Sequence, residues 1–222
     1  MNGKSNIKVE RKLNNFLAMD TSANYLTVAV MKDGKAYTVF KPDCAMRHAV
    51  SVMAAVEEAL AKAEMSLQDC DFFAAVVGAG SFTGIRIGIS AVKGFCSALG
   101  KPALGVTSFD VAAYNTIDDG RALCIVDALH DAYYACGYEG GEVVLPPAYL
   151  SEDEVLALTK AGYRLYACAP CAISEKAPLT LVDPAEGLVK ATRALAEKKA
   201  FGKLSALYVR KSSAELNLEN KG

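Results

Sequence analysis

The chain has 222 residues, 52% of them hydrophobic, and a formal net charge of −1 from 24 Lys and Arg against 25 Asp and Glu. This composition excludes an intrinsically disordered chain, which needs low hydrophobicity and high net charge, and a nucleic-acid binder that works through bulk positive charge. It contains no uninterrupted run of about 18 apolar residues, so no membrane span is predicted.

Residues 1–13 are polar and basic and lack the apolar stretch of a signal peptide, so they are predicted to form a short solvated tail. The seven cysteines are an odd number, and most lie inside apolar runs, which favours buried free thiols over a disulfide scaffold. We therefore expect a cytoplasmic protein without membrane attachment.

The first half of the chain predicts three strands followed by alternating helices and strands. Asp33-Gly34 between two strand-like runs is a strong signal for a tight hairpin, because a type I′ turn needs two positive φ angles. Apolar residues at helical spacing then predict a helix from His48 to about residue 64. The expected ranges are strands at about 16–20, 25–31, 36–40, 72–77 and 103–106, and helices at about 48–64, 83–99 and 109–114.

The second half repeats this pattern. The sequence Ser151-Glu152-Asp153-Glu154 is a capping box that opens a helix, and Asp183-Pro184 opens another, with Asp as N-cap and Pro in the first turn. The last helix is expected to run to about Phe201 and to end at Gly202. Strands are expected at about 123–127, 133–138, 143–145 and 165–168.

Each half begins with a strand that ends in an aspartate, Asp20 and then Asp127. Two α/β halves of strand-strand-strand-helix-strand-helix, each with an aspartate at its first hairpin, are the organisation of the actin, Hsp70 and sugar-kinase superfamily. We therefore predict a two-lobed α/β fold with a reduced second lobe, and a single doubly wound sheet is the alternative. The lobes are expected at 14–107 and 108–222, with a C-terminal segment that packs back on the first.

In that superfamily the paired turns hold nucleotide phosphates, which makes Asp20, Thr21, Ser22 and Asp127 the candidate cofactor-binding residues. Glycines follow the aspartates in a working cleft, whereas Leu129 and His130 stand in the second turn here. We therefore expect vestigial phosphate turns and no cofactor of the chain alone. An ATP-dependent small-molecule kinase is the alternative function.

The most distinctive stretch runs from Gly78 to Gly88 and reads Gly-Ala-Gly-Ser-Phe-Thr-Gly-Ile-Arg-Ile-Gly. It is not a P-loop, because Ile85 stands where Lys is required, and it is not a dinucleotide-binding turn, because Thr83 replaces the third glycine. A turn whose Ser81 or Thr83 caps the following helix is the favoured interpretation. An anion site at the helix N-terminus is the alternative.

The helix that follows has a small-residue face beside a bulky apolar face. Glycine inside a helix costs about 1 kcal/mol relative to alanine, so Gly84 and Gly88 indicate the close approach of another backbone. The approaching backbone could belong to the neighbouring helix at 48–64 or to a helix of a second protein, and the sequence leaves both alternatives open.

Histidine and cysteine patterns give little support for catalysis or metal binding. His48 and His130 have no partners at metal-ligand or triad spacing and are both expected to be solvated. Cys168 and Cys171 have C-x-x-C spacing, but a structural zinc site needs two further soft ligands. No metal site and no catalytic residues are predicted.

Several of these stretches together resemble the TsaB (YeaZ) family of bacterial tRNA threonylcarbamoyladenosine biosynthesis proteins. The resemblance covers about residues 14–213. Ala79 stands where the family usually has Pro, and Ala49 replaces a polar residue after Arg-His. The stretches that carry it are Ala18-Met19-Asp20-Thr21-Ser22, Arg47-His48, Gly78–Gly88, Ile125-Val126-Asp127-Ala128 and Tyr208-Val209-Arg210.

The resemblance implies a non-catalytic scaffold that pairs with TsaD, the metal-dependent transferase that modifies the adenosine next to the tRNA anticodon. It further implies a TsaE-type ATPase in the same assembly, self-pairing through a similar surface, tRNA contact only through the complex, and nucleotide only at the joint with partners. Some relatives carry an older peptidase label, but this sequence shows no serine–histidine or metal constellation that would support a peptidase. Carried over to this sequence, the candidate contact residues are His48, Val52, Met53, Val56, Gly84, Gly88, Ala91 and Phe95.

Overall fold

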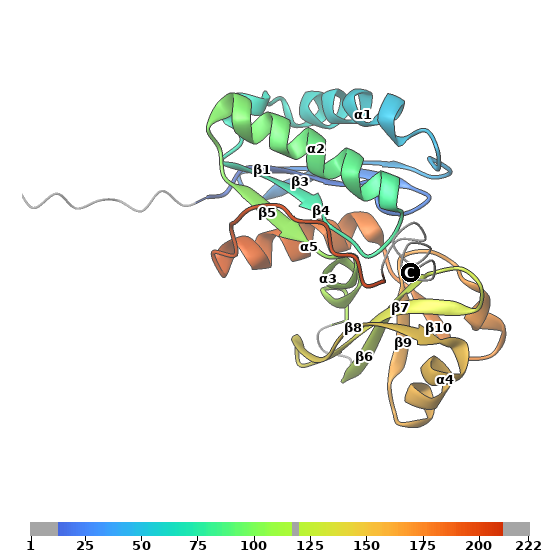
Figure 1. The fold of residues 1–222 in the computed structure, drawn as a ribbon. Coiled ribbons are helices and arrows are strands. Elements are labelled where there is room, and N and C mark those ends of the chain that lie inside the picture. The colour runs from blue at the N-terminus through green and yellow to red at the C-terminus, as the bar shows by residue number, and fades with distance from the viewer. Residues whose placement is uncertain (1–12, 117–119, 211–222) are drawn as a thin grey trace, which may run out of the picture.

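The computed structural model describes residues 13–116 and 120–210, which form two α/β lobes (Figure 1). The first lobe is built on a five-stranded sheet with strand order β3-β2-β1-β4-β5. Strands β3, β2 and β1 pair antiparallel, whereas β1, β4 and β5 pair parallel. The strands are β1 (Phe16–Asp20), β2 (Leu26–Lys32), β3 (Lys35–Lys41), β4 (Phe72–Val76) and β5 (Ala103–Val106).

The second sheet repeats this topology. Its order is β10-β9-β6-β7-β8, so its first strand again lies centrally, with two antiparallel strands on one side and two parallel strands on the other. The predicted duplication of a two-lobed α/β fold is therefore confirmed. The strands are β6 (Arg121–Asp127), β7 (Ala132–Glu139), β8 (Glu142–Ser151), β9 (Arg164–Ala167) and β10 (Leu179–Leu181).

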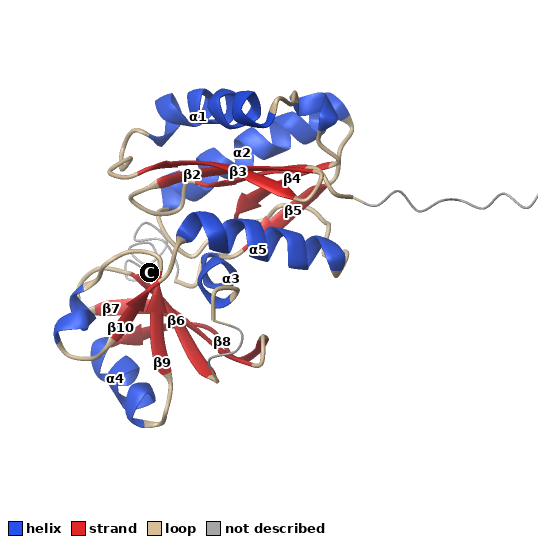
Figure 2. Cartoon of the chain, turned by 180° about the vertical axis from the view of Figure 1, so that it is seen from behind, coloured by secondary structure: helices blue, strands red, loops and turns tan. Residues whose placement is uncertain are grey.

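Helices α1 (His48–Ala63) and α2 (Phe82–Leu99) lie side by side on one face of the first sheet (Figures 1 and 2). The second lobe has α4 (Glu152–Lys160) in the place of α1. A single 3-10 turn, η2 (Ala172–Glu175), stands between its fourth and fifth strands, where the first lobe has α2. This is the predicted reduction of the second lobe.

Two helices are exchanged between the lobes. Helix α3 (Ser108–Ala113) follows the first sheet but packs on β6, β7 and β9, whereas α5 (Pro184–Glu197) follows the second sheet and packs on β1, β2, β3 and β5. The two helices also contact each other, and a Cβ at Gly187 would lie 2.0 Å from the Val111 carbonyl oxygen. A cut at residue 107 would therefore separate the first sheet from α5, whereas α3 would remain with the second sheet.

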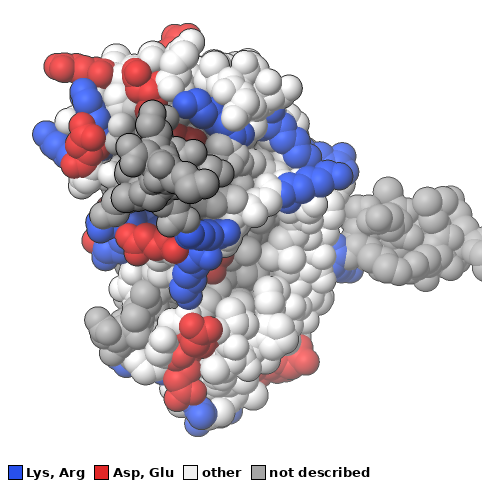
Figure 3. Space-filling model, turned by 90° about the vertical axis from the view of Figure 1, so that its left-hand side faces the viewer, with Lys and Arg blue, Asp and Glu red and all other residues white. Residues whose placement is uncertain are grey.

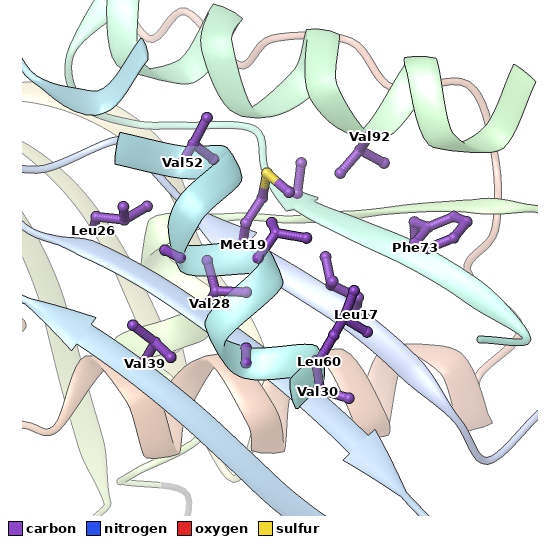
Figure 4. Packing of buried hydrophobic residues seen from close by; sticks show 14 of the residues in the cluster. Leu17, Met19, Leu26, Val28, Val30, Val39, Val52, Leu60, Phe73 and Val92 are labelled. Atoms are coloured by element: carbon purple, nitrogen blue, oxygen red, sulfur yellow. The ribbon is translucent and has the colours of Figure 1, made fainter. Parts of the chain in front are cut away.

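The core of the first lobe lies on both faces of its sheet. Leu17, Met19 and Val28 pack under α1 and α2, toward Val52 and Val92 (Figure 4). On the other face, residues including Phe16 and Phe72 pack under α5. All five residues of β1 are buried, which explains why this strand reads as a continuous apolar run rather than an alternating one.

After α5 the chain returns across the first lobe as an extended segment, residues 201–210, which we call the C-terminal strap. Phe201 forms a bridge with Leu104 of β5. Further along, Leu204 is buried, and the Leu207 N–H donates to the Val77 carbonyl at 2.7 Å. The strap thereby covers the edge of the sheet at β5, which would otherwise expose unpaired backbone groups.

The largest boundary errors concern α5 and β8. The last helix was expected to reach Phe201 but ends at Glu197, because Lys199 takes a left-handed φ of 57°. Strand β8 was expected over three residues but has ten. It can include Pro146 and Pro147, which lack an N–H group, because an edge strand pairs with a neighbour on one side only.

The predicted hairpin at Asp33-Gly34 is confirmed, with φ angles of 49° and 85° between paired Lys32 and Lys35. The short elements η1 (Leu67–Asp69), η2 and β10 were not predicted. Among the helices of the described residues, none combines the length and apolar character needed to span a bilayer.

Candidate functional site

The glycines of the 78–88 stretch fit α2 against the turn that follows β1. A Cβ at Gly80 would lie 2.3 Å from the Ser22 carbonyl oxygen, and one at Gly84 would lie 2.0 Å from the Thr21 carbonyl oxygen. At Gly88, the Thr21 hydroxyl oxygen would be 2.6 Å away. The close backbone approach that these glycines indicate therefore comes from the β1 turn of the same chain. The sequence pointed to an approach but could not identify this partner.

Hydrogen bonds lock the two turns together. The Ser81 N–H donates to the Ser22 carbonyl at 2.7 Å, and the Thr21 hydroxyl donates to the Gly84 carbonyl at 2.7 Å. The Ser81 hydroxyl accepts from the Gly84 N–H, so Ser81 is the N-cap, as the favoured interpretation predicted. The β1 turn and the start of α2 are therefore in direct contact.

Asp20 is fully buried at the centre of this arrangement. Its carboxylate accepts from the Ser22 N–H at 2.8 Å, the Ser22 hydroxyl at 2.6 Å and the Tyr25 hydroxyl at 3.1 Å. Burial raises the pKa of the Asp20 carboxyl above its usual range, and these hydrogen bonds only partly oppose that rise. Both oxygens are thus engaged inside the protein and turned away from solvent.

The corresponding turn of the second lobe is open. Asp127 at the end of β6 is exposed and accepts the Leu129 N–H at 2.7 Å. Leu129, His130 and Asp131 all take left-handed conformations, with φ of 63°, 55° and 54°. The structure therefore places Asp20 and Asp127 in opposite settings, one enclosed and one accessible.

A cleft of about 340 Å³ lies between the lobes, bounded by the β1 turn, the start of α2 and the ends of β6 and β9. Asp127 is the only charged side chain among the described residues that line it. On the face shown in Figure 3, Lys and Arg are intermixed with Asp and Glu on the left and below, whereas the upper right carries Lys and Arg without Asp or Glu among them. The lining residues are Ser22–Tyr25, Ala79–Ser81, Ser108, Ile125–Leu129, Tyr134 and Cys168–Pro170.

Five of the candidate contact residues lie inside the first lobe. Val52 and Val56 point into the core from α1, and Gly84 and Gly88 face the β1 turn. His48 was expected to be solvated but is only 5% exposed, because the first turn of α1 directs its ring to the Tyr25 carbonyl, at 3.0 Å from Nε2. His130 is exposed, as expected.

The other three are less enclosed, although Ala91 and Phe95 still pack against the core, with the Phe95 ring 5.5 Å from that of Phe73. Ala91 and Phe95 of α2 are half-buried, and Met53 of α1 is 44% exposed.

Next to Met53 lies an apolar patch that sequence reasoning missed in part. Met46 is 100% exposed just before α1, and Val50 is 78% exposed on its first turns. Together with Met53 and the exposed Ala49 and Ala54, they form what we call the α1 patch. Val50 and Met53 are three residues apart on α1, so their side chains are neighbours on one helical stripe, a signal present in the sequence, whereas Met46 precedes the helix.

The Cys168-x-x-Cys171 pair lies at the second lobe's side of the cleft, and both thiols are half-buried. Burial raises the pKa of Cys168 to about 12 and that of Cys171 to about 11. Thiols of this kind stay protonated near neutral pH and are poor nucleophiles and metal ligands. Within residues 13–116 and 120–210, no three His, Cys, Asp or Glu side chains are grouped to hold a metal ion.

Comparison with known proteins gives consistent matches. The family model described as "TsaD: tRNA N6-adenosine threonylcarbamoyltransferase" matches residues 34–201. The chain is 31% identical over 97 residues to the tRNA threonylcarbamoyladenosine biosynthesis protein TsaB of Buchnera aphidicola, covering 44% of this chain and 46% of that protein. It is 30% identical over 129 residues to TsaB of Escherichia coli, covering 57% and 55%.

The solved structure of YeaZ from Pseudomonas aeruginosa superposes with a TM-score of 0.75 at 25% identity, covering 88% of this chain and 99% of that one. The matched stretch spans about half the length of the two curated TsaB relatives. With the family model covering most of its residues and the YeaZ fold reproduced across both lobes, the chain belongs to the TsaB (YeaZ) family, which is related to TsaD.

Proposed function

We propose that this protein is a non-catalytic subunit that pairs with a TsaD-type transferase in the threonylcarbamoyladenosine modification of tRNA. The pairing uses the outer side of the α1–α2 layer, centred on the α1 patch. The names of the TsaB relatives and of the matching family model supply the pathway. A TsaE-type ATPase and tRNA would meet this chain only within the larger assembly.

The observation that carries this proposal is the exposure of Val50 and Met53 on the side of α1 away from its buried residues, with the fully exposed Met46 just before the helix. Burial of such a side chain against a partner stabilises a complex by about 1.5–3 kcal/mol when it is complete. Charged side chains of Glu57, Glu58 and Lys62 border the patch farther along α1. An apolar patch with a polar border is typical of protein–protein contact sites.

The setting of the first phosphate turn supports the non-catalytic part of the proposal. A nucleotide cleft needs free backbone N–H groups close to the phosphates. Here Gly80 and Gly84 are in close contact with the carbonyls of the β1 turn, and the oxygens of Asp20 are engaged by Ser22 and Tyr25. An ATP-dependent kinase, the alternative function, would require the contact between the start of α2 and the β1 turn to open.

The test is to mix the purified chain with its cognate TsaD-type transferase and to measure mass by size exclusion with light scattering. We expect a stable complex for the unmodified chain. Val50→Glu places a charge in the patch and should weaken the complex at least about tenfold, which corresponds to about 1.4 kcal/mol. Val143→Glu is the matched control, since Val143 is 52% exposed on β8, in the other lobe.

Both variants change exposed side chains, so each should keep the thermal unfolding midpoint of the unmodified chain. A complex of unchanged affinity with Val50→Glu would show that the patch is not the contact surface. No complex with the unmodified chain, with or without nucleotide, would contradict the pairing itself. Self-association of the chain, where present, should be lost in the same variant.

A further inference from the structure

Helix α2 and the C-terminal strap carry only positive charge. Their charged side chains are Arg86 and Lys93 on α2 and Lys203 and Arg210 on the strap, and all four are exposed. No Asp or Glu occurs in residues 72–109 or 198–210. We call these four residues and the ring of Tyr208 the α2–strap face. The chain has a net charge of −1, so positive charge is separated from negative charge here rather than abundant overall.

The two elements that form this face lie side by side. Leu204 of the strap is buried in the same core cluster as Ile89 and Val92 of α2. The Tyr208 ring stacks on Phe82, in the first turn of α2, at 4.8 Å between centroids. Figure 1 shows the strap along one flank of α2 and α1 along the other. The α2–strap face is therefore separate from the α1 patch.

Cations on this face and on α5 differ in their partners. On α5, Lys190 pairs with Glu186 at 2.7 Å and Arg193 pairs with Glu197 at 3.1 Å. Within residues 13–116 and 120–210, no ion pair involves a cation of the α2–strap face. A carboxylate close by cancels much of the field of a cation, so these unpaired cations attract an anionic partner more strongly.

An aromatic cluster lies among these cations. The guanidinium carbon of Arg86 lies 3.8 Å from the centroid of the Phe82 ring, and its Nε donates to the Tyr208 hydroxyl at 3.0 Å. These contacts fix both rings at the surface, where Phe82 is 39% and Tyr208 is 42% exposed. Unpaired RNA bases stack on aromatic side chains and on Arg guanidinium planes. The face therefore offers base stacking as well as charge.

The spacing of the cations on α2 suits a polynucleotide strand. Arg86 and Lys93 are seven residues apart, which is nearly two full turns and about 10 Å along the helix axis. They therefore point to the same side of α2, where the exposed Ser90 and Ser97 continue the polar stripe. A nucleic-acid strand in a duplex carries a phosphate about every 3.4 Å along its axis, so the two cations reach different phosphates.

We propose that the α2–strap face binds the backbone of tRNA, with phosphates against its cations and an unpaired base on Tyr208. The choice of tRNA rests on the pathway of the proposed function, which the names of the relatives supply. That function leaves the tRNA contact to the whole assembly, whereas this inference assigns part of it to one face of this chain. An acidic protein would match the charge, but the exposed rings favour RNA.

The test is a fluorescence anisotropy titration of a labelled, unmodified tRNA transcript with the full chain. At about 50 mM salt we expect a dissociation constant below about 100 µM. Four phosphate contacts predict a slope of about −3 on logarithmic axes of affinity and salt, so doubling the salt should weaken binding about sevenfold. No binding at about 100 µM chain, or binding that does not weaken with salt, would overturn the proposal.

A double variant locates the contact. Lys93→Gln with Lys203→Gln should weaken tRNA binding about tenfold and make the salt slope shallower by about 2, since each lost phosphate contact removes about 1. Lys35→Gln with Lys160→Gln is the matched control, because it makes the same change of net charge at exposed lysines of β3 and α4. Equal affinities of the two double variants would show that bulk charge binds the RNA and would overturn the proposal.

Base stacking is tested separately from charge. Tyr208→Leu should weaken binding about tenfold and leave the salt slope unchanged. Phe40→Leu is the control, since Phe40 is 47% exposed on β3. Unlabelled poly-glutamate should displace the tRNA less effectively than unlabelled tRNA at an equal concentration of charge. Unchanged affinity in Tyr208→Leu, or equal displacement by poly-glutamate, would overturn the assignment to RNA.

These titrations use the free chain, so their failure is distinguishable from a failure of the pairing, which is measured by the mass of the complex. Each substitution changes an exposed side chain, and an unchanged thermal unfolding midpoint shows that the fold is retained.

Discussion

The two lobes share one strand order, and they differ most where the fourth strand leads to the fifth. In the first lobe this connection is α2, an 18-residue helix that enters through three glycines fitted against the β1 turn. In the second lobe it is the four-residue η2, and the turn after β6 stays exposed, with Asp127 in solvent. The most distinctive motif of the sequence is therefore used for packing in the first lobe, while the unconstrained turn of the second lobe faces a pocket.

Helix α2 therefore contains two kinds of glycine, one in contact with the β1 turn and one in open space. At Gly84 an added Cβ would lie 2.0 Å from a backbone oxygen, whereas at Gly94 nothing lies within 4 Å. We expect Gly84→Ala to lower the free energy of unfolding by about 2–3 kcal/mol, because a backbone has to move to admit the methyl group. Urea denaturation measures this change, which is the largest effect predicted here.

Gly94→Ala is the matched control and should act in the opposite direction. Alanine is favoured over glycine in an open helix position by about 0.5–1 kcal/mol, so this variant should be more stable than the unmodified chain. Equal effects of the two substitutions would contradict the role given to the β1 turn.

An intermediate effect is expected at the enclosed aspartate. The pKa of Asp20 is raised above its unfolded value near 3.8 by burial, so as pH rises the unfolded chain releases this proton first. The stability that comes from Asp20 is therefore present at low pH and is lost as pH rises through the folded pKa. Asp20→Asn cannot titrate and should gain stability relative to the unmodified chain in urea denaturation as pH rises above about 4.

The matched variant for this pH series is Asp127→Asn in the open turn, where the carboxyl is exposed. It makes the same Asp-to-Asn change without altering a buried carboxyl, so it controls for the substitution itself. A stability difference that is constant with pH for Asp20→Asn would show that Asp20 does not titrate across this range in the folded protein.

The smallest effect is expected at the C-terminal strap, which joins the lobes at its last described residue. Arg210 lies over the Tyr149 ring at 4.8 Å and donates to its hydroxyl. This contact is exposed, so Arg210→Ala should cost only about 0.5–1 kcal/mol. Arg193→Ala removes an exposed arginine from α5 that pairs within its own helix, and it should change the unfolding midpoint less.

Much of the fold could be predicted because local signals agree with the tertiary arrangement. The Asp33-Gly34 hairpin, the capping box at Ser151 and the Asp183-Pro184 helix start all appear in the structure as expected. The duplication could be inferred from two strands that each end in an aspartate. These features depend on backbone chemistry within a few residues, which the sequence shows directly.

What the sequence could not supply was the neighbour of each side chain. Gly84 and Gly88 indicated close approach, but only the fold shows that the approaching group is Thr21. His48 looked solvated because nothing in its local pattern reveals that it faces the Tyr25 carbonyl. Met46 and Val50 were overlooked because an exposed apolar stripe has the same spacing as a buried one.

The central claim, that the α1 patch is the contact surface for a TsaD-type transferase, is tested most directly by oxidative footprinting of methionines. Exposed methionine is readily oxidised to the sulfoxide. Met46 and Met53 are 100% and 44% exposed, while Met19 and Met31 are buried and serve as internal controls. The account predicts that Met46 and Met53 oxidise in the free chain and are protected when the transferase is added. Equal oxidation of both residues in the free chain and in a complex verified by its mass would contradict it.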